Sequence, residues 1–180
     1  MPLYTSGWNL KKMAIIGTQI TIDKNGRFVV PSDKRRIFDE SKNIIVVLDD
    51  ADEIRRRVLI YSGKSHLAHL NHLRNLASKG FITKSGEKLT KAESLRIVSM
   101  YEENAIVRRI DPSGRMSLPL EILGLAGIKD IAYIGGVQRI ALYSPPIWKQ
   151  LVEEREHLLK SLSYEQRVEL AEIPFEGHVE

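Results

Sequence analysis

The chain has no cysteine among its 180 residues, so it forms neither disulfides nor thiolate metal sites. It also lacks any apolar run long enough to span a bilayer. Its first 17 residues, MPLYTSGWNLKKMAIIG, do not contain the continuous apolar region of a secretory signal. These absences argue against a secreted disulfide module and a membrane protein. They predict a cytoplasmic location and no membrane partner.

Signatures of catalysis are missing as well. The sequence has no Gly-rich phosphate-binding loop, no nucleophile elbow and no recognisable spacing of a catalytic triad. Its histidines and carboxylates do not fall into a pattern that indicates general acid and base groups. We therefore expect a protein that is not an enzyme, with no cofactor and no small-molecule substrate.

Charge is unevenly distributed along the chain. The net charge is +4, but residues 151–180 hold three Lys or Arg and eight Glu, which leaves the other 150 residues at +9. A basic body with an acidic tail is compatible with a polyanionic partner, because clustered Lys and Arg attract phosphate groups. A solvated surface with uneven charge explains the same numbers, so net charge alone leaves both interpretations open.

An internal repeat organises the sequence. Residues 20–31 read ITIDKNGRFVVP, and residues 108–119 read RRIDPSGRMSLP. At one constant offset of 88, the identical pairs are Ile22/Ile110, Asp23/Asp111, Gly26/Gly114, Arg27/Arg115 and Pro31/Pro119. Ungapped matching of this kind is typical of a duplicated structural unit. Similar strands follow in both copies, and the offset falls to 82 at Tyr61/Tyr143, which predicts a longer loop in the first copy.

Each copy predicts two strands around a tight turn, a short helix and two further strands. In the first copy Asn25-Gly26 is a strong hairpin signal, because both residues accept the positive φ of such turns. Pro31 ends the second strand, since proline cannot donate to a strand ladder. Ser32 is a candidate N-cap for the short helix that follows. The same pattern recurs 88 residues later.

Helical patterns lie between and after the copies. Residues 64–80 predict a helix that ends at Gly80. Residues 88–105 predict a second helix, with Thr90 as N-cap and Glu93 in the capping-box position. A last helix is expected from Pro145, because proline suits the first helical turn.

Each repeated unit of about 45 residues is too small to bury its own apolar face well. We therefore expect the two units to intertwine around one shared, barrel-like core. One chain would then be a covalently linked pseudo-dimer of the α+β class, flanked by helices.

The repeated Asp-x-x-Gly-Arg motif, followed by strand residues and a proline, resembles the MraZ family of transcriptional regulators. The segment Leu142–Leu151, LYSPPIWKQL, is also similar to the family's Tyr-to-Trp stretch before the last helix. The likeness covers residues 15 to 160 of this sequence. It implies two swapped-hairpin units of the SpoVT and AbrB class that close into one pseudo-dimeric barrel. The implied divisions are a first repeat at 15–62, a helical connector at 63–105, a second repeat at 106–150 and an acidic helical tail at 151–180.

The resemblance also implies a function. MraZ-like chains assemble into ring-like homo-oligomers and bind short direct repeats upstream of the division and cell-wall gene cluster. The expected partners are therefore double-stranded DNA and other copies of this chain, and the expected location is cytoplasmic and nucleoid-associated.

DNA contact in the family is tied to the motif arginine, which is Arg27 in the first copy and Arg115 in the second. A guanidinium group can bind guanine O6 and N7 together, so both residues are predicted to read bases in a groove. Phosphate contacts are predicted for the basic residues around the first turn: Lys24, Lys34, Arg35 and Arg36.

The other motif residues are expected to be structural. Their carboxylates would cap turn amides and their glycines would supply the turn conformation, at Asp23, Gly26, Asp111 and Gly114. The second copy departs from the family pattern, because Pro112 and Ser113 precede its Gly-Arg and the acidic Glu121 lies in its following helix.

Three histidines, His66, His69 and His72, recur every third residue in the first connector helix. A helix would bring them within about 120° of one another, and three imidazoles can hold zinc. No carboxylate lies among them, and the interleaved leucines favour an interface helix. We therefore predict no metal site.

Two other functions fit parts of the sequence. The leucine-rich helices and the acidic tail would suit a non-catalytic assembly module. An antitoxin-type DNA binder of the AbrB class would share the fold, although such proteins usually carry one barrel unit. Affinity for DNA with a steep salt dependence separates a DNA binder from an assembly module, because phosphate contacts release counterions.

Overall fold

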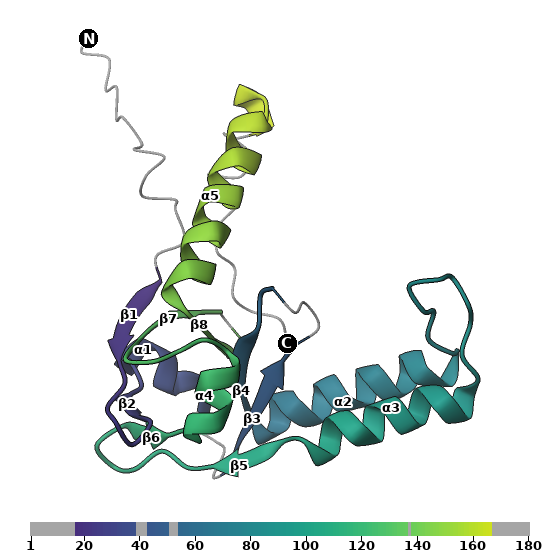
Figure 1. The fold of residues 1–180 in the computed structure, drawn as a ribbon, viewed down its shortest axis with the longest axis horizontal. Coiled ribbons are helices and arrows are strands. Elements are labelled where there is room, and N and C mark those ends of the chain that lie inside the picture. Colours follow the sequence, from purple (N-terminus) through teal and green to yellow (C-terminus); the bar gives the residue numbers. More distant parts are fainter. Residues whose placement is uncertain (1–16, 39–42, 51–53, 137, 167–180) are drawn as a thin grey trace. The chain divides into compact units, whose positions relative to one another are not determined.

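The computed structural model describes residues 17–38, 43–50, 54–136 and 138–166 (Figure 1). The chain divides into two compact units, of which Gly17–Pro145 contains every described strand. The predictions for residues 1–16 and for the acidic segment 167–180 lie outside the described residues. Within the described ranges, no helix is both long and apolar enough to cross a membrane.

The described strands form one six-stranded sheet and one two-stranded ribbon, and all of their pairings are antiparallel. The order in the sheet is β1 (Thr18–Thr21), β7 (Ile131–Gly135), β8 (Ile140–Tyr143), β4 (Arg57–Ser62), β3 (Ile44–Asp49) and β5 (Ile106–Arg108). The ribbon joins β2 (Arg27–Val29) to β6 (Arg115–Ser117). The α+β class is confirmed. The sheet keeps two ends, at β1 and β5, so the closed pseudo-dimeric barrel stays a prediction.

The expected hairpin between the first two strands is wrong. β1 pairs with β7, and β2 pairs with β6, so the two strands separate after the turn that joins them. The turn itself forms, with the Asp23 amide donating to the Arg27 carbonyl at 2.9 Å. Asn-Gly determines only the local turn, whereas strand partners depend on which pairing buries the apolar side chains. Pairing with β6 buries Phe28 against the other copy's Met116 and the main core.

The two copies interlock with matching registers. Thr18 lies opposite Ile134 in the pairing of β1 with β7, and Ile106 lies opposite Val46 in the pairing of β5 with β3. Thr18 and Ile106 are 88 residues apart, as are Val46 and Ile134. Each outer strand of one copy is therefore completed by the equivalent inner strand of the other.

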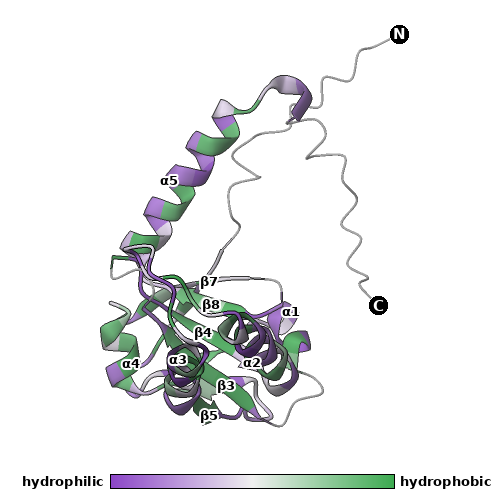
Figure 2. Ribbon diagram, turned by 90° about the vertical axis from the view of Figure 1, so that its right-hand side faces the viewer, coloured by the Kyte–Doolittle hydropathy of each residue, from purple (hydrophilic) through white to green (hydrophobic). Residues whose placement is uncertain are grey.

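The central strands carry apolar side chains on both faces. Side chains alternate between the two faces of a strand, so Ile60 and Leu142 enter the main core while Leu59 and Ala141 enter a second cluster. Figure 2 shows hydrophobic residues concentrated on β3, β4 and β8, and hydrophilic stretches on α1, α2 and α3. The sheet is thus covered on both sides at its centre.

The helices occupy α1 (Ser32–Arg35), η2 (Arg36–Phe38, a 3-10 turn), α2 (Gly63–Ser78), α3 (Lys91–Glu103), α4 (Leu120–Leu125) and α5 (Pro145–Ser161). α2 and α3 lie side by side and bury Leu70, Ala77 and Val98 between them (Figure 1). They form a helical hairpin that extends from the β-rich part of this unit.

The predicted capping box of α3 is confirmed, because the Thr90 hydroxyl accepts from the Glu93 amide while the Glu93 carboxylate accepts from the Thr90 amide. The predicted N-cap at Ser32 is wrong. Pro31 holds the extended N-cap conformation and α1 begins at Ser32, so the serine lies inside the first turn. α5 begins at Pro145 as expected.

Candidate nucleic-acid interface

The first motif folds into a turn that its own aspartate closes. Asp23 Oδ1 accepts hydrogen bonds from the amides of Asn25 at 2.8 Å and Arg27 at 2.9 Å. The Arg27 amide, opposed by some desolvation, holds the pKa of the Asp23 carboxyl below its usual value, and the Asn25 amide acts in the same direction. Gly26 has a φ of 73°, a conformation that favours glycine. The turn fixes the backbone from which the Arg27 side chain extends.

The second motif repeats this construction. Asp111 Oδ1 accepts from the Arg115 amide at 2.8 Å, and Gly114 has a φ of 77°. The Asp111 amide donates to the Arg115 carbonyl at 2.9 Å, as the Asp23 amide does in the first turn. Two equivalent turns therefore present two arginines.

The turns are also bonded to the strands of the opposite copy. The Leu118 amide donates to the Gly26 carbonyl at 2.9 Å, and the Val30 amide donates to the Gly114 carbonyl at 2.9 Å. Leu118 and Val30 are themselves 2% and 0% exposed, so these bonds join each turn to the core. Both arginines are consequently held on one rigid support.

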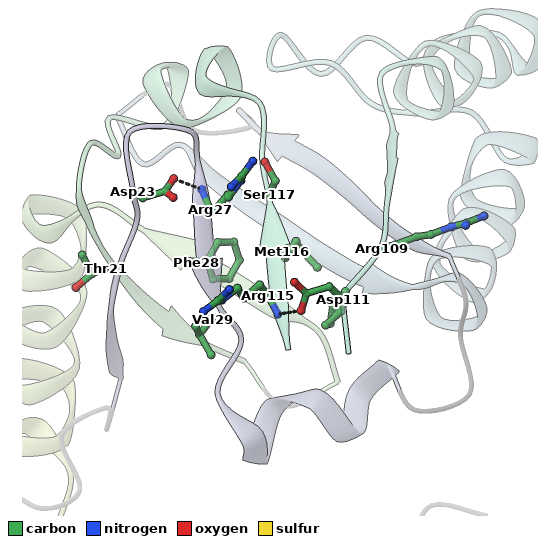
Figure 3. A pocket seen from close by; sticks show the side chains of 11 residues that line it. Thr21, Asp23, Arg27, Phe28, Val29, Arg109, Asp111, Arg115, Met116 and Ser117 are labelled. Carbon is green, nitrogen blue, oxygen red and sulfur yellow. Dashed lines mark hydrogen bonds between the residues drawn. The ribbon is translucent and has the colours of Figure 1, made fainter. Parts of the chain in front are cut away.

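Side chains of the ribbon alternate between core and solvent. In the pairing of β2 with β6, Arg27 lies opposite Ser117 and Val29 lies opposite Arg115, and all four are exposed. We call these four residues the ribbon face. Figure 3 shows Arg27 with Ser117 towards one end of the ribbon and Val29 with Arg115 towards the other. A groove of about 730 Å³ is lined by the ribbon face and by both motif aspartates.

The backbone of each ribbon-face arginine helps to hold its turn, whereas its guanidinium group does not. Within the described part of the chain, the guanidinium groups of Arg27 and Arg115 form no hydrogen bond or ion pair. Both side chains are exposed to solvent. Because guanidinium groups bind phosphate and guanine with paired donors, these two are free to bind an external anion or base edge.

The four other predicted DNA contacts fall into two pairs. Lys24 and Arg36 are exposed. Lys34 Nζ donates to the Gly136 carbonyl at 2.9 Å, and Arg35 Nε donates to the Val30 carbonyl at 2.8 Å, so both are engaged within the chain. The Arg35 guanidinium fills the space where a side chain at position 114 would lie. Sequence reasoning missed this support of the second turn, because no local pattern links residues so far apart.

The two neighbouring arginines of this segment allow a matched test. Arg35→Ala is expected to lower the free energy of unfolding by about 1 kcal/mol, because it removes a charged donor from the carbonyl of a buried residue. Arg36→Ala, at an exposed position, is expected to leave it unchanged within about 0.5 kcal/mol. Urea denaturation of both variants measures the difference, and equal values would contradict the supporting role of Arg35.

Sequence reasoning also missed two members of the ribbon face, Val29 and Ser117. The signal was present, because residues two positions apart on a strand share a face. Arg109 lines the same groove, although its side chain points away from the ribbon in Figure 3.

A second cluster of polar side chains lies on the opposite face of the central strands. The centroid of the Tyr61 ring lies 5.7 Å from that of His66 and 5.6 Å from that of His69. The rings of both histidines also pack against the ring of Tyr101. Arg139 Nη1 donates to the Tyr61 hydroxyl at 2.8 Å. No group of three His, Cys, Asp or Glu side chains among the described residues is arranged to hold a metal ion.

Burial lowers the pKa of His66, and the neighbouring His69 adds to this effect while Glu102 opposes it. Burial likewise lowers the pKa of His69, helped by Arg139 and His72 and opposed by Asp49. The folded protein therefore keeps both imidazoles neutral at pH values where the unfolded chain, with an ordinary pKa of 6.5, begins to take up protons.

The free energy of unfolding is accordingly expected to fall as pH drops from about 7.5 to about 5.5, because protons then favour the unfolded chain. His66→Phe should keep the ring packing and remove part of that fall. Leu70→Ala, which weakens the same helical hairpin without removing a titrating group, should retain the wild-type slope. Urea denaturation at several pH values measures this, and an unchanged slope in His66→Phe would contradict it.

No family model matches the chain. A curated protein, the transcriptional regulator MraZ of Spiroplasma kunkelii, is 28% identical to it over 145 residues. The alignment covers 79% of this chain and 90% of that protein. The resemblance first drawn from the two turn motifs is therefore confirmed over most of the sequence.

Proposed function

The chain is similar to a MraZ transcriptional regulator over most of its length, and from this premise we propose that it is a sequence-specific DNA-binding transcriptional regulator. One observation carries the proposal beyond the likeness. Two arginines, whose guanidinium groups form no hydrogen bond or ion pair in the described part of the chain, share the solvent face of a two-stranded ribbon. A ribbon of this kind fits the major groove of B-DNA.

The proposal gives the basic residues different tasks. Arg27 and Arg115 enter the groove and bind base edges, because their turns hold them on one support. Lys24 and Arg36, which are exposed beside the first turn, bind phosphates. Lys34 and Arg35 stabilise the protein that presents these groups, through their bonds to backbone carbonyls.

The DNA target, the oligomeric state, the location and the closure of the barrel are proposed from the family resemblance. The proposed features are, in that order, binding to direct repeats upstream of the division and cell-wall gene cluster, assembly into a ring-like homo-oligomer, a nucleoid-associated location, and closure of the two repeats into one pseudo-dimeric barrel. The interlocked strand pairs support a shared core, and the turns of both copies meet at one ribbon.

A binding selection from random DNA tests the function, because it requires no assumption about the operator sequence. The full chain is incubated with a pool of duplexes that carry a randomised core, and bound duplexes are enriched over several rounds. We expect one sequence family to emerge. Its affinity should fall about tenfold between roughly 50 and 200 mM NaCl, as the two phosphate contacts of Lys24 and Arg36 would require.

Two results would count against the proposal. An assembly module would retain no duplex at the lower salt concentration. A protein with only non-specific affinity would lose binding with salt but would enrich no sequence. Light scattering on the same preparation reports the oligomeric state independently of DNA.

A further inference from the structure

The ribbon face is symmetric in position but not in chemistry. The offset of 88 relates Arg27 to Arg115 and Val29 to Ser117. Each arginine therefore lies opposite the equivalent position of the other copy, but Arg115 faces an isopropyl group and Arg27 faces a hydroxymethyl group. The two halves of the ribbon face present different surfaces to a bound molecule.

Val29 is exposed although its neighbours along the strand are buried. Its exposed fraction is 49%, against 3% for Phe28 and 0% for Val30. A single exposed apolar side chain is common on protein surfaces and needs no functional explanation by itself. Here, however, it lies in a groove next to a guanidinium without a partner in the described chain.

The equivalent position shows that the fold does not require an apolar side chain there. Ser117 occupies it in the other copy, with the same alternation of buried and exposed residues along the strand. Its hydroxyl donates to the Asn25 carbonyl at 3.3 Å, so it is turned towards the first turn. Strand packing therefore does not explain why the first copy has valine where the second has serine.

Resting on the proposed DNA binding, we infer that Val29 is a specificity-determining residue that selects a thymine beside the base bound by Arg115. In the major groove only thymine presents a methyl group, and apolar side chains recognise it by contact. The pair Val29 and Arg115 thus reads a methyl group next to a hydrogen-bonding base edge, whereas Ser117 and Arg27 do not. The ribbon face then distinguishes one orientation of its site from the other.

Uracil substitution tests this inference, because uracil pairs as thymine does and lacks only the methyl group. Each thymine of the duplex enriched by the wild-type chain is replaced in turn. At one thymine, uracil is expected to weaken wild-type binding about fourfold, the effect of leaving one methyl group uncovered. Val29→Ser should bind the thymine and uracil duplexes equally, within about twofold.

Val107→Ser is the matched control, since Val107 is 54% exposed on β5 and lies outside the groove. It should keep the wild-type response to uracil. Thermal melting should show both variants as stable as the wild type, because neither valine is buried.

The outcomes separate the two claims. If a sequence is enriched but no uracil substitution affects the wild type more than Val29→Ser, the inference about Val29 is overturned and DNA binding stands. If no sequence is enriched, the proposed function and this inference fall together.

Discussion

Removal of both Arg27 and Arg115 is expected to lower the affinity for the enriched duplex by about a hundredfold or more. Each bidentate contact with a guanine contributes about 1–3 kcal/mol of discrimination, so the single alanine variants should each lose about tenfold. The melting temperature should not change, because the guanidinium groups form no hydrogen bond or ion pair within the described part of the chain. Fluorescence anisotropy titrations and thermal melting measure the two effects.

A control must remove the same charge from elsewhere. Lys91→Ala/Arg96→Ala takes two exposed cationic side chains from α3 and should keep the affinity within about twofold. Arg27→Lys/Arg115→Lys keeps the charge but loses the paired donors, so it should retain non-specific binding and lose selectivity. If the control double variant loses as much affinity for the duplex as Arg27→Ala/Arg115→Ala does, net charge rather than the ribbon face determines binding.

Gly26→Ala is expected to destabilise the protein by about 2–5 kcal/mol. Two costs add: an alanine with positive φ costs about 1–2 kcal/mol, and overpacking typically costs about 1–3 kcal/mol more. The overpacking is unavoidable, because a Cβ atom at this position overlaps the Leu118 carbonyl oxygen. That oxygen belongs to backbone held in the core, where Leu118 is 2% exposed.

Gly114→Ala provides the comparison, since its φ of 77° is nearly the same as that of Gly26. Its added Cβ meets the guanidinium of Arg35, the far end of a flexible side chain that can move aside. Moving aside would break the bond from Arg35 to the Val30 carbonyl, so Gly114→Ala is made in the Arg35→Ala background. There we expect a further loss of about 1–2 kcal/mol, the cost of the backbone conformation alone. Urea denaturation gives both values, and equal losses for the two variants would contradict the role assigned to the Leu118 carbonyl.

Local features of the fold were predictable from the sequence. The capping box of Thr90 and Glu93 and the start of α5 at Pro145 depend on residues within one helical turn, and both are observed. The partners of β1 and β2 were not predictable from local signals, because Asn25-Gly26 favours a hairpin whichever strands are finally paired. Strand choice depends on burial across the whole unit.

The candidate site shows the same division between local and distant effects. The motif identified Arg27 and Arg115, and both are exposed on one ribbon. Charge alone placed Arg35 among the phosphate contacts, whereas the structure bonds it to the Val30 carbonyl and sets it against Gly114. The sequence contained the charge of Arg35 but no indication of its neighbour in the second copy.

The reciprocal bonds between Gly26 and Leu118, and between Gly114 and Val30, have a consequence for synthesis of the protein. While the chain grows on the ribosome, the first turn has no partner until residue 118 has emerged, and β1 waits for β7 at Ile131–Gly135. Pairings this distant along the chain form late in folding. A product of interrupted translation would therefore lack a formed ribbon, and with it the surface proposed to bind DNA.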